Sequence, residues 1–124
     1  MKNESIAIGL VKIPVTDLGR ATAYYREILG LAEDFAVEEY GWAQYAVGGA
    51  PVCLYVPGMG GGTGEPGGDC GLHLVVDDAR ALHDTLSTRG ADLLGDLSEG
   101  DDGTVSFDVR DPDANVIRVM QRQA

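Results

Sequence analysis

The strongest constraint on the fold of this chain is an internal repeat in which a strand is followed by a helix. When Asp17 is aligned with Asp78, the apolar strand residues before each aspartate also align, as does the first helical residue after it. The aligned pairs are Val11 with Leu72, Ile13 with Leu74, Val15 with Val76 and Leu18 with Ala79. A unit this short cannot bury both its sheet and its helix alone, so the two copies are expected to share a core, within one chain or across a dimer.

Each copy of the repeat contains one amphipathic helix and four strands. In the first copy, residues 6–15 read as a strand, and apolar residues at helical spacing follow Asp17 until Gly30 ends the helix. In the second copy, a strand at 70–77 precedes a helix at 78–89, which ends at Gly90. The other strands are expected at 33–38, 42–47, 52–56, 92–97, 104–110 and 115–121. The pattern predicts an α+β fold built from two βαβββ modules.

A glycine-rich segment at residues 57–69 separates the two copies. It contains seven glycines and two prolines and almost no apolar side chain, so we expect a flexible connection. A phosphate-binding loop would need a lysine in this segment, and none is present. We therefore predict a single domain over residues 6–122, with module one at 6–56 and module two at 70–122.

The charge of the chain limits its partners. Twenty acidic and nine basic residues give a formal net charge of −11, which argues against binding to nucleic acid phosphates and favours cationic small molecules.

The longest apolar run, residues 6–11, is far below the ~20 residues of a membrane-spanning helix, and no signal peptide pattern is present. Cys53 and Cys70 are isolated and are expected to be reduced thiols. We expect a cytoplasmic protein that binds neither membranes nor nucleic acid.

A turn sequence near the C-terminus precedes a strand that carries one large charged residue. Residues 111–115 read Asp-Pro-Asp-Ala-Asn, which is typical of a turn, and Arg118 lies in the strand that follows.

Four segments of the chain, taken in order, resemble the vicinal oxygen chelate superfamily, which includes glyoxalase I, extradiol dioxygenases and bleomycin-resistance proteins. They are IPVTDL at 13–18, AYYREILG at 23–30, LHLVVDD at 72–78 and FDVRDPDANVI at 107–117. The resemblance implies that the paired modules curl into an incomplete barrel with a concave pocket.

The same resemblance locates four positions that carry metal ligands in the glyoxalase-like enzymes of this superfamily. In this chain they are Leu10, Cys53, Gly71 and Arg118. Such enzymes use imidazole and carboxylate ligands in octahedral geometry, whereas leucine and glycine offer no side-chain donor atom and arginine is a fixed cation. The resemblance therefore implies the metal-free branch, with no metal site and no cofactor.

Strand alternation, together with the core positions that the resemblance implies, places further candidate ligand-binding residues on the pocket face with Arg118. They are His73, Trp42, Gln44, Tyr55, Asp108 and Lys12. Arg118 either anchors a ligand through a carboxylate, phosphate or carbonyl group, or forms an internal salt bridge with Asp108. On the concave face we expect its guanidinium to be partly desolvated. His73 either lines the pocket or acts as a base, and His83, on the second helix, is expected to face solvent.

Three functions stay open on this evidence. We favour a metal-free protein that binds or sequesters a small cationic or aromatic molecule in the barrel cleft. The alternative is a lyase, isomerase or dioxygenase of the same superfamily that acts on a small metabolite, with no catalytic residue assigned beyond a role for His73 with Arg118. The third is a structural or regulatory dimer. We also expect a homodimer, since the modules leave sheet edges that a two-fold partner can cover.

Overall fold

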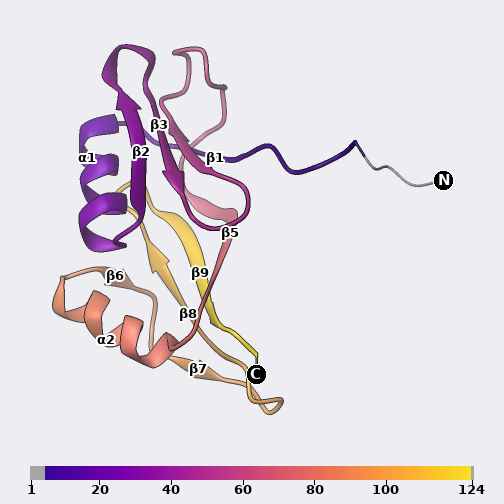
Figure 1. Ribbon diagram of the computed structural model, residues 1–124. Coiled ribbons are helices and arrows are strands. Elements are labelled where there is room, and N and C mark those ends of the chain that lie inside the picture. Colours follow the sequence, from indigo (N-terminus) through magenta and orange to yellow (C-terminus); the bar gives the residue numbers. More distant parts are fainter. Residues whose placement is uncertain (1–4, 124) are drawn as a thin grey trace.

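The computed structural model describes residues 5–123, which form two β-sheets that lie side by side (Figure 1). The first sheet contains β1 (Val11–Pro14), β4 (Val52–Tyr55), β3 (Trp42–Ala46) and β2 (Ala32–Val37), in that order. The second contains β5 (Gly68–Val76), β9 (Asn115–Gln121), β8 (Val105–Arg110) and β6 (Asp92–Leu93), and β7 (Ser98–Glu99) also pairs with β8. In each sheet the strand before the helix pairs in parallel with the last strand of the module. The predicted α+β fold of two βαβββ modules is confirmed.

The two helices begin at the aspartates that define the repeat. Asp17 accepts a hydrogen bond from the backbone N–H of Arg20 at the start of α1 (Leu18–Ala23), and Asp78 accepts one from Ala81 at the start of α2 (Ala79–Thr88). A π-helical turn at Tyr24–Ile28 extends α1. Gly30 and Gly90 follow the helices with φ values of 76° and 79°, the left-handed conformation that glycine adopts without steric cost. Neither helix within residues 5–123 is long and apolar enough to pass through a lipid bilayer.

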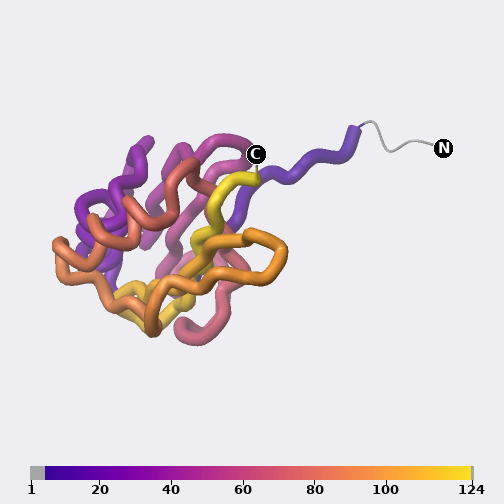
Figure 2. The backbone as a smooth tube through the Cα atoms, turned by 90° about the horizontal axis from the view of Figure 1, so that it is seen from below, coloured from indigo at the N-terminus to yellow at the C-terminus, as the bar shows by residue number. Residues whose placement is uncertain are grey.

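One hydrophobic core lies between the sheets and the helices, which cover the same side of both sheets (Figures 1 and 2). Module one contributes Ile13, Val15, Leu18, Ala21, Tyr25, Leu29, Ala43, Tyr45, Val52 and Leu54. Module two contributes Leu72, Leu86, Phe107, Val109, Ile117 and Val119. The modules therefore share their core within one chain.

The turn at residues 111–115 joins the two modules. Asp111, which is only 4% exposed, accepts a hydrogen bond from the Tyr25 hydroxyl at 2.7 Å. Asn115 Nδ2 donates to the Pro14 carbonyl at 2.9 Å and to Asp111 Oδ2 at 2.8 Å. Ala114 adopts a φ of 62°, which the tight turn requires. The Asp-Pro-Asp-Ala-Asn sequence thus forms a polar junction between the two modules.

The first strand is shorter than predicted. Residues 6–10 do not pair, because the neighbouring strand β4 begins at Val52, and the chain before Pro51 turns away through Gly48 and Gly49. Val11, whose N–H donates to the Pro51 carbonyl, is therefore the first residue with a partner on β4.

The predicted strand at 92–97 is also shorter, and it pairs only at Asp92 and Leu93. The chain leaves the sheet shortly afterwards, at Gly95, where φ is 79°. The short strand β7, absent from the prediction, then pairs Ser98 with Ser106.

The glycine-rich segment is not the flexible connection that its composition suggests. Residues 57–64, which we call the glycine strap, fold back over Tyr55 on the first sheet. The N–H of Gly58 donates to the Gly62 carbonyl at 2.9 Å, and Lys12 Nζ donates to the Gly61 carbonyl at 2.6 Å. A Cβ at Gly61 would lie 2.8 Å from Tyr55 Cβ, so the missing side chain is what permits this close approach.

Candidate functional site

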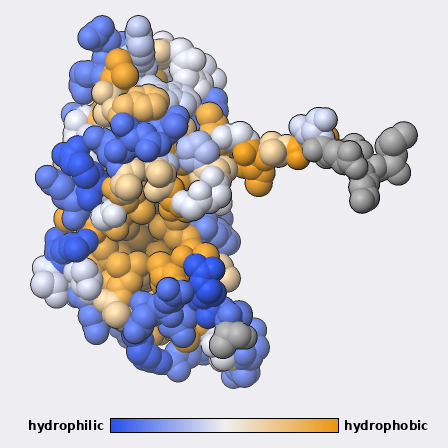
Figure 3. Space-filling model, viewed as in Figure 1, coloured by the Kyte–Doolittle hydropathy of each residue, from blue (hydrophilic) through white to orange (hydrophobic). Residues whose placement is uncertain are grey.

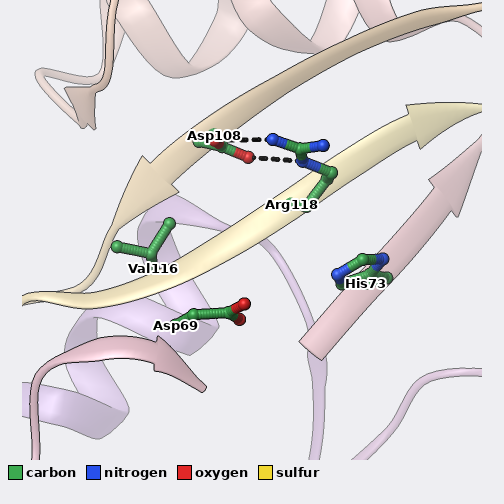
Figure 4. A pocket seen from close by; sticks show the side chains of 5 residues that line it. All are labelled: Asp69, His73, Asp108, Val116 and Arg118. Atoms are coloured by element: carbon green, nitrogen blue, oxygen red, sulfur yellow. Dashed lines mark hydrogen bonds and ion pairs between the residues drawn. The ribbon is translucent and has the colours of Figure 1, made fainter. Parts of the chain in front are cut away.

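Three polar side chains lie in register across neighbouring strands of the second sheet. His73 on β5 is paired with Arg118 on β9, and Arg118 is paired with Asp108 on β8. Their neighbours Phe107 and Val119 point into the core, so alternation directs all three to the opposite face of the sheet (Figure 4). With Asp69 and Val116 they line a hollow of about 300 Å³.

Arg118 and Asp108 form a bidentate ion pair. Arg118 Nε donates to Asp108 Oδ1 at 2.9 Å, and Nη2 donates to Oδ2 at 3.1 Å (Figure 4). These hydrogen bonds, with the charge of the guanidinium, hold the pKa of Asp108 below its ordinary value. The same hydrogen bonds, with the charge of the Asp108 carboxylate, raise the pKa of Arg118. Of the two interpretations left open by the sequence, the internal salt bridge is therefore present. It uses two of the five guanidinium donors.

The ion pair is more exposed than expected. The side chain of Arg118 is 49% exposed and that of Asp108 is 27% exposed. The guanidinium is less desolvated than expected, because the outer face of the second sheet is open to solvent at this point, where His73 is exposed too. An exposed pair of this kind contributes only about 0–1 kcal/mol to stability.

Asp69 reaches the hollow through an irregularity in β5. The pairing of β5 with β9 shifts between Asp69 and His73, and Gly71 in between has a φ of 79°. The Gly71 N–H donates to Asp69 Oδ1 at 2.9 Å. The hollow therefore contains two carboxylates and one guanidinium. Sequence reasoning missed Asp69 because it assigned this residue to the connection, although Asp69 shares the odd-numbered alternation of His73.

The other predicted ligand-binding residues lie on the first sheet, away from this hollow. Lys12 and Tyr55 hold the glycine strap: Lys12 Nζ lies 5.0 Å from the centroid of the Tyr55 ring, and the Gly64 N–H donates to the Tyr55 hydroxyl. Gln44 Nε2 lies 3.5 Å from Asp34 Oδ2. Trp42 lines a different hollow, together with Phe35 and Tyr40 among others. The structure brings together only His73, Asp108 and Arg118 from the predicted set.

The pairing of the first sheet repeats that of the second. Lys12 is paired with Cys53, and Cys53 with Gln44, so this row corresponds to His73, Arg118 and Asp108. The internal repeat thus extends to the outer face, but the two rows carry different chemistry. Cys53 is fully buried, and burial raises the pKa of its thiol.

The four positions at which related enzymes would hold a metal do not offer a suitable donor set. Leu10 lies before β1, Gly71 has no side chain, and Arg118 presents a cation. Cys53 is the remaining member, a buried thiol. Within residues 5–123, no group of three or more His, Cys, Asp or Glu side chains is arranged to hold a metal ion. A resident divalent cation does not fit this set of residues.

His83 is not exposed to solvent as predicted. Its ring centroid lies 5.1 Å from that of Phe107, and its Nε2 atom is buried without a hydrogen-bond partner among the described residues. The residue faces the core side of β8 because α2 packs directly on this strand. His83 is therefore part of the packing beneath the second sheet, on the side opposite to the hollow.

Comparison with known proteins identifies relatives of this fold. The family model described as "Glyoxalase/Bleomycin resistance protein/Dioxygenase superfamily" matches residues 7–119. A superfamily member from Sphaerobacter thermophilus DSM 20745 has a TM-score of 0.81 and 21% sequence identity, with 94% of this chain and 98% of that chain covered. A lactoylglutathione lyase from Agrobacterium tumefaciens has a TM-score of 0.76 and 18% identity, with 93% and 92% covered.

A glyoxalase-related enzyme from Fulvimarina pelagi is also similar, with a TM-score of 0.75 and 19% identity over 94% of this chain and 88% of that chain. Sequence identities this low establish a common fold and do not extend to substrates. A search of curated proteins finds no match.

Proposed function

Because the chain belongs to the glyoxalase/bleomycin resistance protein/dioxygenase superfamily, we propose that it is a metal-free protein that binds a small polar molecule. The binding site is the hollow lined by His73, Arg118, Asp108 and Asp69. In this proposal the protein acts in the cytoplasm and sequesters its ligand without transforming it.

The observation that carries this proposal is the orientation of Arg118 by Asp108. A bidentate pair fixes the plane of the guanidinium, so little conformational entropy is lost when the donors not used by Asp108 bind a ligand. Those donors suit the oxygen atoms of a carboxylate, a phosphate or a carbonyl group. Arg118 therefore serves as the anchor, and Asp108 positions it.

The charge of the hollow narrows the class of ligand. Asp69 and Asp108 outnumber Arg118, so the two carboxylates leave an excess of negative charge beside the anchor. A net charge of −11 on the whole chain adds to this field. A zwitterion, or a cation that also carries an oxygen acceptor, satisfies both signs of charge in the hollow, whereas a simple polyanion does not.

Binding without a metal is proposed from the residues at the four family positions. Elemental analysis of protein expressed in metal-supplemented medium tests this part of the proposal. We expect no stoichiometric divalent metal. One tightly held transition metal per chain would contradict the assignment of the four positions, and it would favour the lyase, isomerase or dioxygenase alternative.

Ligand binding is tested by a thermal-shift screen of zwitterionic metabolites, cationic drugs and aromatic acids. A ligand at about a hundred times its dissociation constant adds roughly 2.7 kcal/mol to the folded state, enough for a clear shift in Tm. We expect Arg118→Ala to abolish the shift produced by a hit. The matched control is Arg110→Ala, which removes a similarly exposed arginine that pairs with Asp92 outside the hollow.

The two variants separate specific binding from a general effect of charge. Loss of the shift in Arg118→Ala with its retention in Arg110→Ala supports the site. An equal response of both variants would show that the ligand binds elsewhere and would refute the proposed site. Turnover of the hit, detected by a new chromatographic peak or a change in its mass spectrum, would replace sequestration with an enzymatic function.

A further inference from the structure

A second hollow, on the outer face of the first sheet, contains three aromatic rings and a thioether. It has a volume of about 310 Å³, and its larger lining residues are Phe35, Val37, Tyr40, Trp42 and Met59. The exposed fractions of Phe35, Tyr40 and Met59 are 45%, 66% and 45%. Large apolar side chains that are this exposed around one hollow mark a binding surface. We call this hollow the aromatic hollow.

The strands of the first sheet bring the three rings together. Trp42 on β3 is paired with Val37 on β2, and Phe35 shares the face of Val37 because side chains alternate along a strand. Tyr40 lies in the short 3₁₀ turn Glu38–Tyr40, which joins β2 to β3. The rings therefore come from one continuous hairpin.

The glycine strap closes the hollow on another side. Met59 of the strap packs on Gly41, since a Cβ at Gly41 would lie 2.9 Å from Met59 Sδ. Gly61 packs on the indole ring, because a Cβ there would lie 3.0 Å from Trp42 Cε3. The strap thus holds the thioether and the indole in position, and a ligand loses little free energy in ordering them.

Negative charge lies beside the aromatic hollow, and no charged side chain lines it among the residues that the structure describes. Residues 33–39 contain four acidic residues and no basic one. Glu38 and Glu39 are exposed in the same turn as Tyr40, and Glu38 lines an adjoining hollow together with Met59. The ammonium group of Lys12 is bound by the Gly61 carbonyl and does not line the hollow. The local field therefore attracts a cation.

We propose that the aromatic hollow binds a small organic cation that carries a quaternary ammonium group. The faces of the aromatic rings attract a cation within about 6 Å, and the neighbouring carboxylates add to this attraction. A quaternary ammonium group has no N–H group, so it gives up no N–H hydrogen bonds to water when it enters an apolar hollow. The volume is at the lower end of the range of about 300–1,000 Å³ for small-molecule sites, which suits a ligand of this size.

The other large hollows of the described chain have different chemistry. The apolar hollow between the two modules, visible in Figure 3, is lined mainly by aliphatic side chains, with no phenylalanine, tyrosine or tryptophan among its described lining residues. The hollow that contains Arg118 shares no lining residue with the aromatic hollow. The proposed function is tested through Arg118 and this inference through Tyr40, so failure of one leaves the other intact.

The fluorescence of Trp42, the single tryptophan, reports directly on ligand binding in the hollow that it lines. The probe is choline, and its control is the uncharged carbon analogue in which a tert-butyl group replaces the trimethylammonium group. At constant ionic strength, choline should change the emission in a saturable way. The analogue should bind about 2- to 30-fold more weakly, the factor that corresponds to about 0.5–2 kcal/mol of cation–π attraction. Equal binding of the two compounds would overturn the proposal, as would the absence of saturable choline binding in both fluorescence and titration calorimetry.

Replacement of Tyr40 separates the ring from its bulk. Tyr40→Leu should weaken choline binding about 2- to 30-fold, whereas Tyr40→Phe, which keeps an aromatic face, should bind within about twofold of the unmodified protein. Tyr40 is 66% exposed, so neither replacement disturbs the core, and circular dichroism verifies the fold. A Tyr40→Leu variant that binds choline as tightly as the unmodified protein would overturn the proposal.

The contribution of the neighbouring carboxylates is tested in the same titration at low salt. Glu38→Gln/Glu39→Gln should weaken choline binding more than Asp84→Asn/Asp96→Asn does, although both double variants remove the same charge. Asp84 and Asp96 are exposed residues of module two and serve as the matched control. Equal losses in the two double variants would show that only the net charge of the chain acts, and would overturn the placement of the cation.

Discussion

In the proposed site, the Arg118–Asp108 pair would orient a ligand-binding group while adding little to the stability of the fold. The guanidinium of Arg118 is about half exposed, so water screens its attraction to Asp108. A long arginine side chain held in one geometry has nevertheless lost part of the ~2 kcal/mol of rotamer entropy that a ligand would otherwise have to remove. The value of the pair thus lies in the orientation of the remaining donors.

The first prediction concerns the stability of this pair. Arg118→Ala and Asp108→Ala should each lower the free energy of unfolding by less than about 1 kcal/mol, since exposed pairs contribute about 0–1 kcal/mol. The double variant should cost less than the sum of the two, because both replacements remove the same interaction. Urea unfolding at neutral pH measures all three. A loss of about 3 kcal/mol in either single variant would indicate a buried pair and contradict the observed exposure.

The second prediction gives the pH dependence of the same pair. Arg118 lowers the pKa of Asp108 in the folded protein, so the carboxylate contributes stability above its unfolded pKa of about 3.9. That contribution decreases as the pH falls through the lower folded pKa. The small difference in unfolding free energy between the unmodified protein and Asp108→Asn should therefore be present at about pH 5 and vanish as the pH falls well below about 3.9. A difference that grows on acidification would have the wrong sign.

At the scale of helices and strands, the features that could be predicted from the sequence are those that neighbouring residues determine. Asp17 and Asp78 cap their helices and Gly30 ends the first one, because caps and C-terminal glycines act within a few residues of the chain. The superfamily identified from four segments is confirmed by the match over residues 7–119. The pairing of Arg118 with Asp108 could also be anticipated, since strand alternation put both on one face.

The elements that the sequence did not predict depend on distant partners. The extent of β1 is set by where β4 begins at Val52, and no local pattern at residues 6–10 reveals this. The glycine strap is ordered by Lys12 and Tyr55, which lie outside it in the sequence. His83 is only partly exposed because its ring packs against Phe107. Each of these errors arose where tertiary contacts override the local pattern.

The third prediction tests whether the glycine strap is held against the first sheet. Gly61→Ala should lower the free energy of unfolding by about 1–3 kcal/mol, because its Cβ would lie 2.8 Å from Tyr55 Cβ and the strap would have to move. Gly49→Ala is the matched control: it has open space around it and no positive φ, so it should be neutral or stabilise by up to about 1 kcal/mol. Urea unfolding measures the free energy of unfolding of both variants. Equal stabilities would mean that the strap is not packed on Tyr55.

At the scale of the whole molecule, the two modules are joined by buried polar contacts as well as by the core. Asp111 of module two accepts hydrogen bonds from the Tyr25 hydroxyl of module one, from the backbone N–H groups of Asp113 and Asn115, and from the Asn115 side chain. Burial, together with the charge of Asp111, raises the pKa of Tyr25, so the phenol keeps the proton that it donates. Module one and module two should therefore unfold together.

The last prediction uses Asp111→Ala to measure this coupling. The substitution leaves several buried donors without an acceptor, each at a cost of about 1–3 kcal/mol, so a total loss of about 3 kcal/mol or more is expected. Tyr25→Phe removes only one donor and should cost about 1–2 kcal/mol.

The informative probe is the fluorescence of Trp42, the single tryptophan, which lies in module one, far along the chain from Asp111. Because the core is shared, the Asp111→Ala midpoint in urea should shift equally in Trp42 fluorescence and in circular dichroism, which reports on both modules. A fluorescence midpoint that stays at its unmodified value while the circular dichroism midpoint falls would show that module one folds independently.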